Sequence, residues 1–542
     1  MLQIQYPDRY APTPHRLKKF LELSSRSPLS DPWLDNYDLR PIPKENRRWG
    51  FWTYSVFWLS AAATLSNWYS PSSFMSLGLT IWEALACHLG GQFLAGVHMV
   101  FSGRPGAVYH VGFPVVARSS FGLIGAFWPV VNRACMSIIW NGINLVQGGQ
   151  CVYVMLHAIF PSIANLHNVL GEDDALNSGG FIGFWIFWLL VTLCSYISIP
   201  KLKPFLHVKV IIFFASAIAM LAWTLKLSGG IGDIGKTTAS VHGSEKAWLI
   251  VRFTLLSWAN CSTFIVNAAD LQRYVNKPNN VVFGQIVGFP IGNFVVSLVG
   301  LIVASTSVTL YGEVIWNPVV FLDTILTSNY TAANRAGAFF LGLLFAYSAL
   351  FSCIFENIIP AGNDLMALLP KYINITRGFL ICNLLSIGCV PWRLLATSVS
   401  FITWLSAYQI FLSAIVGVIM ADYFLVSKGY LAIDPHLFVR SKDSYYWFYH
   451  GFNLRAFAAY IIGIVPNFYG FLGNVGLHIT AAGEKFYYFA FPVGFLVSFV
   501  TYWALCWYYP TPTANTCWSE PLEDNDSGNS TTEEFSADDK KM

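Results

Sequence analysis

The chain has 542 residues, of which 55% are hydrophobic, 16% aromatic and only 11% charged. A soluble domain of this length does not have such a composition, so the sequence predicts an all-α polytopic membrane protein. The formal net charge of +3 is too small to indicate a nucleic-acid partner. The ten cysteines include no CxxC pair, and neither a disulfide framework, a metal site nor a cofactor is predicted.

Twelve membrane-spanning helices are predicted when about 20 apolar residues are taken per crossing. They cover residues 51–74, 76–101, 126–158, 180–199, 205–227, 247–269, 281–309, 336–362, 376–390, 395–425, 452–470 and 486–508. This divides the chain into a polar N-terminal segment (1–50), a transporter domain (51–510) and an acidic, Ser/Thr-rich tail (511–542) that we expect to be disordered. The polar N-terminal segment contains no apolar core, so no cleavable signal peptide is expected.

The basic residues orient these spans, because they collect in the loops on the cytosolic side of a membrane. With the N-terminus inside, the outer loops carry only Lys236, Lys246, Arg335, Arg393 and Lys485. The inner loops then carry Arg104, Arg118, Lys201, Lys203, Lys209, Arg273, Lys277, Lys371, Arg377, Lys428, Arg440, Lys442 and Arg455. We therefore expect an integral protein, of the plasma membrane, with both termini in the cytosol.

Spans one and six are both interrupted by small and hydroxyl residues. The run Ser60–Asn67 interrupts span one, and the run Ser257–Thr263 lies between the apolar flanks of span six. Small residues also allow close helix packing, which would explain either run alone. A matched pair of interrupted helices instead points to a midplane binding site in a five-helix inverted repeat.

Span three offers a recognition surface for a flat ring. Trp140 and Asn144 share one helical face because residues four apart are neighbours. An aromatic plane beside an amide suits a hydrogen-bonding heterocycle, since the ring gives contact area and the amide contacts polar edges. The alternative is a tryptophan that faces lipid or the protein core.

Residues 352–378 hold the most informative polar groups of the chain. Glu356 and Asn357 lie inside an otherwise apolar run, and a Pro-Ala-Gly step follows at 360–362. An acid at membrane depth is costly and marks a pathway or a site, and the Pro/Gly step predicts a break that faces a cavity. Asn363 and Asp364 fit polar caps at a helix end.

Several motifs spread over the chain resemble the fungal branch of the nucleobase–cation symporter-1 family. This branch contains the uracil, uridine and allantoin permeases and their thiamine-transporting relatives. The matching segments are NYDLRPIP at 36–43, RRW at 47–49, GGQCVYVML at 148–156, NAADLQRY at 267–274, AGNDL at 361–365 and PKYINITRG at 370–378. The resemblance implies a LeuT-like fold of twelve helices, in which broken helices 1 and 6 flank the substrate and two extra helices follow at the C-terminus. It also implies uptake driven by a cation through alternating access.

The resemblance assigns roles to individual positions. Trp140 matches the tryptophan that stacks on the substrate ring, Asn144 replaces the usual glutamine, and Asn357 matches a substrate-binding asparagine. The aromatic position that closes the other face of the ring is Cys261 in this chain, and Trp258 lies one turn earlier.

The resemblance also bears on coupling. Two hydroxyl positions that bind Na⁺ in bacterial relatives are Phe351 and Ser352 here, so we expect coupling to protons. Glu356 replaces a commonly small residue, and it either pairs with a cationic ligand or carries the coupling proton. Asp270 and Arg273 are predicted to form a tether at the inner end of span six.

The leading prediction is therefore a proton symporter for a uracil-, uridine- or allantoin-like heterocycle. A cationic vitamin such as thiamine or nicotinamide riboside is the alternative substrate, and a non-transporting membrane sensor is the alternative of another class. An enzyme is not predicted, because no nucleophile–base pair or metal-ligand spacing is found. Lys540 and Lys541 in the tail are candidate ubiquitin acceptors for trafficking.

Overall fold

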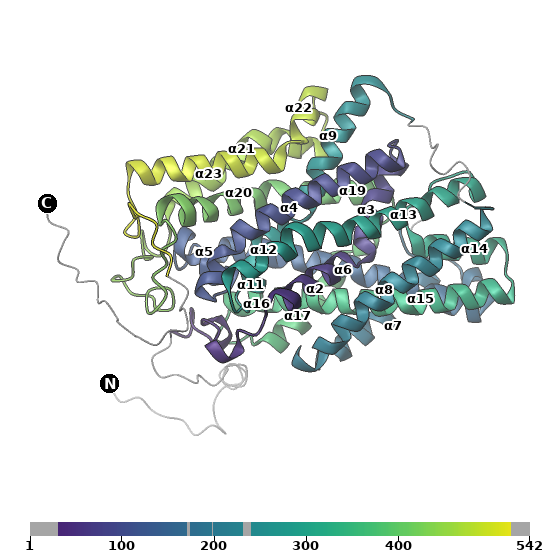
Figure 1. Ribbon diagram of the computed structural model, residues 1–542, viewed down its shortest axis with the longest axis horizontal. Helices are drawn as coiled ribbons and strands as arrows, with labels where there is room; N and C mark the ends of the chain where they lie inside the picture. The colour runs from purple at the N-terminus through teal and green to yellow at the C-terminus, as the bar shows by residue number, and fades with distance from the viewer. Residues whose placement is uncertain (1–30, 171–173, 198, 231–239, 522–542) are drawn as a thin grey trace.

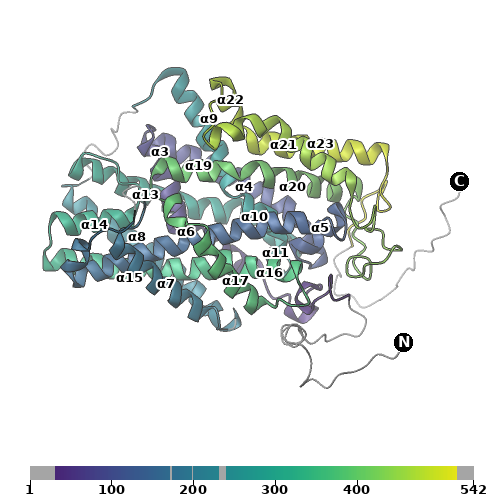
Figure 2. The same ribbon diagram turned by 180° about the vertical axis from the view of Figure 1, so that it is seen from behind.

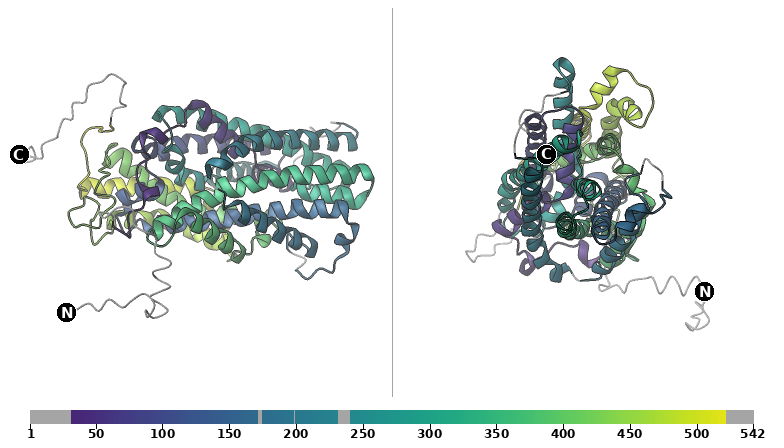
Figure 3. Two further views of the ribbon diagram at one scale, coloured as in Figure 1. Left: turned by 90° about the horizontal axis from the view of Figure 1, so that it is seen from below. Right: turned by 90° about the vertical axis from the view of Figure 1, so that its right-hand side faces the viewer.

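The computed structural model describes residues 31–170, 174–197, 199–230 and 240–521, in which every regular element is a helix. The long helices lie side by side along the longest axis of the molecule (Figure 1) and form one bundle when viewed from its end (Figure 3). By length and composition, seven helical segments of the described residues could span a membrane: Ile81–Tyr109, Pro204–Leu227, Pro278–Tyr311, Ala332–Leu368, Ser398–Val426, Leu454–Asn474 and Ala490–Tyr508. A polytopic helical membrane protein is thereby confirmed, whereas the number twelve stays a prediction.

The other predicted spans correspond to helices that are shorter, broken or more polar. Helix α7 (Ser178–Cys194) has 17 residues, and α17 (Ile375–Gly388) has 14. Helix α6 (Phe127–Ile159) is long and continuous, but its middle carries buried amides such as Asn141 and Gln147. Such amides lower the hydropathy of a helix while offering hydrogen bonds to the bundle interior.

Span one is broken where its sequence changes from bulky to small residues. Helix α2 (Phe51–Ala62) ends before Ala63, and α3 (Leu65–Ser76) begins after Thr64. The hydroxyl of Thr64 accepts a hydrogen bond from the backbone N–H of Asn67 at 3.3 Å, which caps the new helix. The predicted interruption of span one is therefore present.

Span six is divided into three pieces. Helix α9 (Gly243–Asn260) ends at the predicted interruption, and the short helices α10 (Ser262–Val266) and α11 (Ala268–Gln272) follow. Cys261 and Asn267 are the residues between the pieces. Both helices expected to be broken are thus broken, and their relation by an inverted repeat stays a prediction.

Span eight differs from the prediction, because the Pro-Ala-Gly step does not break it. Helix α15 (Ala332–Ser352) continues through a π-helical segment, Cys353–Ile358, into α16 (Ile359–Leu368). Pro360 is the second residue of α16, directly after the π-helical segment. Asn363 and Asp364 consequently lie inside α16 and do not cap a helix end.

Span ten is broken as well. It consists of α19 (Ser398–Ala407), α20 (Gln409–Ala421) and a π-helical segment, Asp422–Val426, with Tyr408 between α19 and α20, and the short helix α18 (Pro391–Leu394) precedes it. Helices α21 (Leu454–Asn474) and α23 (Ala490–Tyr508) pack beside α20 (Figure 2).

The remaining helices complete the bundle and its ends. Those of the predicted spans are α4 (Ile81–Tyr109), α8 (Ile199–Leu227), α12 (Val281–Phe283) and α13 (Phe289–Tyr311). Three connecting helices have no counterpart in the sequence prediction: α5 (Phe113–Phe121), α14 (Pro318–Ser328) and α22 (Ala481–Tyr487).

We call the end of the bundle predicted to face the cytosol its inner end, and two chain segments cover it. Asn36, in the N-terminal segment, donates to the carbonyl of Pro370 at 3.3 Å. After α23 the chain returns, and Glu520 pairs with Arg104 of α4 at 2.9 Å. The first part of the predicted tail is therefore ordered, whereas Lys540 and Lys541 lie outside the described residues.

Candidate functional site

A small cavity of about 50 Å³, lined by both polar and apolar side chains, lies where the breaks of spans one and six face α6 and span eight. Its lining includes five of the predicted site residues: Trp140, Asn144, Cys261, Glu356 and Asn357. The rest of its lining consists of Ala61, Thr64, Ser66, Asn67, Asn260, Thr263, Phe264 and Phe289. The cavity is smaller than the roughly 300 Å³ at which ligand pockets begin, so a ring can enter only when side chains around it move.

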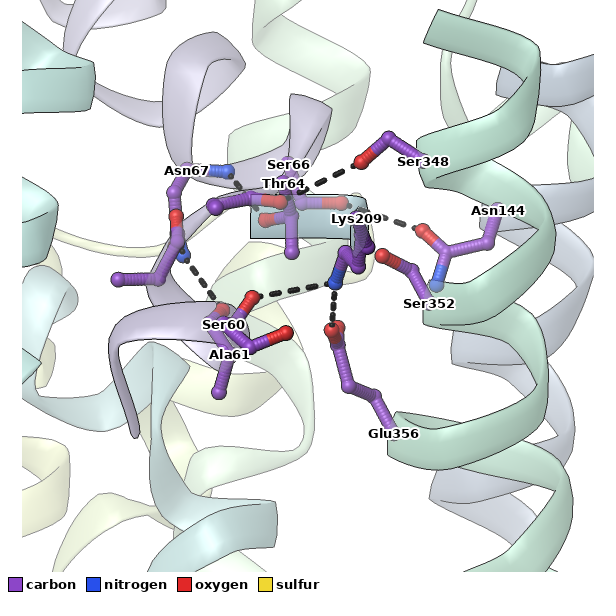
Figure 4. Close-up of polar contacts among 12 residues, drawn as sticks. Ser60, Ala61, Thr64, Ser66, Asn67, Asn144, Lys209, Ser348, Ser352 and Glu356 are labelled. Atoms are coloured by element: carbon purple, nitrogen blue, oxygen red, sulfur yellow. Dashed lines mark hydrogen bonds and ion pairs between the residues drawn. The ribbon is translucent and has the colours of Figure 1, made fainter. Parts of the chain in front are cut away.

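The break in span one leaves backbone carbonyls that need partners, because a helix end has no intrahelical donors for them. Asn67 donates from its amide to the carbonyls of Ala61 and Ala62 at 3.3 and 3.0 Å. Ser348 of α15 donates to the carbonyl of Ala63 at 3.4 Å (Figure 4). Side chains from two different spans thus stabilise the end of α2.

Lys209 of α8 supplies the third donor at this break. Its ammonium contacts the carbonyl of Ser60 at 3.1 Å and the carboxylate of Glu356 at 2.6 Å (Figure 4). The lysine side chain is fully buried and that of Glu356 is 11% exposed. The negative end of the α2 dipole also favours a cation here. Counting loop charges wrongly placed Lys209 in an inner loop.

The π-helical segment of span eight explains how two consecutive residues reach one cavity. A π turn is wider than an α turn, and it brings both Glu356 and Asn357 to the cavity lining. Asn357 donates to the carbonyl of Ser352 at 3.3 Å. The predicted acid and amide of span eight therefore lie together at the site.

Phe351 and Ser352, the two positions that the resemblance matches to sodium-binding hydroxyls, lie at the end of α15 in the same span. The ring of Phe351 stacks against Phe205 of α8, with centroids 5.9 Å apart, and faces Phe355 at 6.3 Å. Ser352 lies one turn before Glu356, on the side of the helix that faces Lys209 (Figure 4). An aromatic ring offers no oxygen ligand, so only one of the two positions retains a hydroxyl.

On α6, Trp140 and Asn144 lie on the predicted shared face. The rings of Trp140 and of Trp404 from α19 form a T-shaped pair, with a centroid distance of 4.8 Å and an interplanar angle of 79°. Asn144 accepts a hydrogen bond from Ser66 at 3.4 Å, and Gln147 donates to the same hydroxyl at 3.0 Å. Trp404 therefore packs against the ring of Trp140, while the amide of Asn144 belongs to a polar network with span one.

Span six faces the cavity with Asn260, Cys261 and Phe264. The thiol of Cys261 donates to Gln92 at 3.1 Å. Trp258 does not line the cavity, and its ring packs against Phe491 of α23 at a centroid distance of 5.1 Å. Phe264 is the aromatic residue that span six presents in its place, three residues after Cys261.

The predicted tether at the inner end consists of two separate contacts. Asp270 accepts from the backbone N–H of Phe113 at 2.8 Å, and Arg273 donates to the carbonyl of Asp38 at 3.0 Å. Both side chains are buried, so they are not solvated loop charges. Asp270 thereby holds α11 to α5, and Arg273 holds the N-terminal segment.

A second buried ion pair lies toward the inner end of the same helices. Arg133 of α6 contacts Asp364 of α16 at 2.7 Å, with side chains 2% and 0% exposed. Arg133 also donates to Ser137 at 2.6 Å. This pair locks α6 to span eight below the cavity, and it explains why Asp364 does not act as a cap.

Sequence reasoning missed Lys209, Gln147, Phe264 and the pair Trp404 and Tyr408 of span ten. Lys209 had a signal, since it falls inside the predicted span 205–227 and a charge there marks a function. The aromatics of span ten had none, because the chain contains 20 Trp and 26 Tyr. Among the described residues, no group of three His, Cys, Asp or Glu side chains is arranged to hold a metal ion.

A helical bundle with broken spans around a buried cavity that holds polar side chains is typical of a membrane transporter. The solved structure of Mhp1, a nucleobase-cation-symport-1 family transporter, in a closed conformation with bromovinylhydantoin bound, matches with a TM-score of 0.70 at 15% identity. The match covers 89% of this chain and 98% of that chain. At this identity the likeness shows a common fold, the LeuT-like fold expected from the sequence.

The family model described as permease for cytosine/purines, uracil, thiamine and allantoin matches residues 41–494. The uridine permease of Saccharomyces cerevisiae is 37% identical over 510 residues, which cover 93% of this chain and 79% of that protein. The allantoin permease of the same yeast is 36% identical over 492 residues, covering 89% and 77%. The chain belongs to this permease family, as the motifs indicated, and it is a transporter and not an enzyme.

Proposed function

We propose that the protein imports a neutral nitrogenous heterocycle of the uracil, uridine or allantoin kind by symport with protons. The observation that carries this proposal is the position of the Lys209 ammonium, between the Ser60 carbonyl and the Glu356 carboxylate. It bears both on the charge of the substrate and on the coupling ion.

The charge argument starts from Glu356. Its carboxylate lines the cavity but already has a counter-ion in Lys209 at 2.6 Å. The other polar groups of the lining are amides and hydroxyls, such as Asn144, Asn260 and Asn357. Neutral donors and acceptors suit a ring that carries both N–H and C=O groups. A cationic ligand such as thiamine would instead have to separate Glu356 from Lys209, which is costly for a buried pair.

The coupling argument concerns the end of α2. Backbone carbonyls and a nearby span-eight hydroxyl are the kind of hard oxygen ligands that hold a metal cation, but a lysine ammonium already contacts the Ser60 carbonyl. Phe351 has no hydroxyl, although the resemblance matches its position to one of two hydroxyls that bind Na⁺ in bacterial relatives. A buried Lys–Glu pair can take up and release a proton in place of a metal ion.

The test is uptake in a transport-deficient host, with a panel of labelled uracil, uridine, allantoin, thiamine and nicotinamide riboside. We expect uptake of a neutral compound that protonophore abolishes and sodium does not affect. Trp140→Ala, expressed to the same level at the surface, is the matched control and should lose uptake. Sodium-dependent uptake would refute proton coupling, uptake of only the two cations would favour the vitamin alternative, and no uptake would favour a sensor.

A further inference from the structure

A second, larger cavity of about 360 Å³ lies at the outer end of the bundle, opposite the inner end, apart from the site described above. Its walls come from α9, from the α19–α20 junction of span ten, and from α21 and α22, which lie together in Figures 1 and 2. The volume is within the range of roughly 300–1,000 Å³ typical of small-molecule pockets. The cavity is therefore large enough for a ligand.

The wall of this outer cavity contains the groups that hold the break in span ten. Asn474 of α21 donates to the carbonyl of Thr403 at 2.9 Å and accepts from the hydroxyl of Ser406 at 2.8 Å. Tyr487 of α22 donates to the carbonyl of Ser406 at 2.7 Å. The position of α19 thus depends on hydrogen bonds that line this cavity.

The opposite face of the same turn covers the central site. Trp404 meets Trp140 at 4.8 Å, and Tyr408 donates to the carbonyl of Asn260 at 3.2 Å. Thr403, Ser406 and Gln409 line the outer cavity. Helix α19 therefore separates the two cavities, and its two faces serve different sites.

The outer cavity has both a basic and an acidic group in its lining. The guanidinium of Arg252 lies over the ring of Tyr488 at 5.2 Å and belongs to no ion pair in the part of the chain that the structure describes. Glu484 accepts a hydrogen bond from the Tyr488 hydroxyl at 3.3 Å. A guanidinium that lies against aromatic rings and has no carboxylate partner can bind a carboxylate, and Glu484 can bind an ammonium.

We propose that the outer cavity binds a small zwitterion, of the size and chemistry of a neutral polar amino acid. Arg252 holds its carboxylate, Glu484 its ammonium, and the amides and hydroxyls of Ser406, Gln409 and Asn474 its side chain. Occupancy stabilises α19 over Trp140. The binding part of this proposal is independent of the transport function; its effect on α19 rests on the proposed function.

The test uses the purified full-length protein in nanodiscs. Its thermal midpoint of unfolding is measured at increasing concentrations of L-serine, L-asparagine or L-glutamine. We expect a saturable rise with at least one of them, and no rise with the corresponding amino alcohol, which lacks the carboxylate. In Arg252→Gln the half-maximal concentration should increase about 10-fold or more, as expected for losing a charged hydrogen bond.

Two further variants make the result decisive. Lys485→Gln removes a cation of the same helix α22 that lies over Trp248 and not in the cavity, and it should bind as the wild type does. Glu484→Gln should weaken binding as Arg252→Gln does, which keeps the test valid if Arg252→Gln does not fold. No stabilisation by any of the three amino acids, or an equal effect of the amino alcohol or of inorganic phosphate, would overturn the proposal.

A transport measurement then addresses α19. External amino acid should slow uptake of the labelled heterocycle by the wild type but not by Arg252→Gln. Binding without an effect on uptake would refute the role of α19 and leave the binding site standing. A failure of the proposed transport function would appear as absent uptake with binding intact, so the two failures are distinguishable.

Discussion

The two broken helices that flank the central cavity are stabilised by different kinds of donor, because among the described residues only the break of span one has carbonyls bonded to a charged side chain. At the break of span one, the carbonyls of Ser60, Ala61, Ala62 and Ala63 accept hydrogen bonds from Lys209, Asn67 and Ser348. Along the broken part of span six, the carbonyls of Ser257, Asn260 and Ile265 accept hydrogen bonds from the neutral side chains of Gln92, Tyr408 and Ser102. The side-chain oxygen of Asn260 has no hydrogen-bond partner among the described residues.

This difference indicates that the two breaks have different roles in the protein. At span one the carbonyls of the break are bonded to side chains, and the buried Lys209 ammonium fixes their geometry, although the hydroxyl of Ser60 has no partner among the described residues. A buried polar atom without a partner is costly and is available to a ligand. We infer that span one holds the coupling machinery in place, and that span six offers groups to the substrate. The four changes below test this contrast.

The largest effect is expected from Lys209→Met, which removes the charged donor from the break of span one. It leaves Glu356 buried without a counter-ion, and removing one partner of such a pair costs about 3–5 kcal/mol. The thermal midpoint of the purified protein should fall strongly, and concentrative uptake should be lost. The double variant Lys209→Met/Glu356→Gln should regain most of the stability without regaining accumulation. A single variant as stable as the wild type would contradict the pairing.

A smaller loss is expected from Asn67→Ala, which removes the donor to the carbonyls of Ala61 and Ala62. Unsatisfied buried acceptors cost about 1–3 kcal/mol each, so the thermal midpoint should fall clearly. Ser348→Ala is the matched control, because it removes one longer bond at the same break. If the thermal midpoint falls further in Ser348→Ala than in Asn67→Ala, then Asn67 does not contribute more to the stability of this break than Ser348.

Asn144→Gln should leave stability nearly unchanged and alter substrate choice. The added methylene moves the amide relative to a ring on Trp140, and gaining or losing one neutral hydrogen bond changes relative uptake by about 2- to 10-fold. Competition between uracil, uridine and allantoin for labelled substrate measures the change. Asn141→Gln is the control, since Asn141 bonds to Asn383 of α17 at 2.9 Å and does not line the cavity. Identical competition profiles for Asn144→Gln and the wild type would remove Asn144 from the binding site.

The smallest effect is expected from Tyr408→Phe, on the span-six side. It deletes the bond to the Asn260 carbonyl at 3.2 Å, a neutral interaction worth about 0.5–1.5 kcal/mol. The thermal midpoint should fall less than in Asn67→Ala, although both variants remove support from a helix break. A loss as large as that of Lys209→Met would mean that span six is held as firmly as span one.

The two broken helices could be predicted from the sequence because a break at membrane depth requires small and polar residues. Ser60–Asn67 and Ser257–Thr263 could therefore be found without a structure. Trp140 and Asn144 followed from helical spacing. The Pro-Ala-Gly step at 360–362 misled, because the same residues suit both a break and the first turn of a helix after a π segment.

Partners of buried charges could not be predicted, because they come from other spans. Lys209 and Glu356 are 147 residues apart, and Arg133 and Asp364 are 231 apart. Nothing in the local pattern of either residue specifies its partner. The orientation of the spans was predicted by treating every lysine near the end of a span as a solvated loop residue. Lys209 is instead buried in an ion pair.

The thiol of Cys261 gives this transporter a native chemical reporter. It is a free cysteine, 4% exposed, at the break of span six. A maleimide that reaches it reports that the cavity has opened, and a bound heterocycle would shield it. Once the exposed Cys135 and Cys517 and the partly exposed Cys194 and Cys389 are replaced by serine, the alkylation rate of Cys261 would follow the access cycle in living cells without any added label.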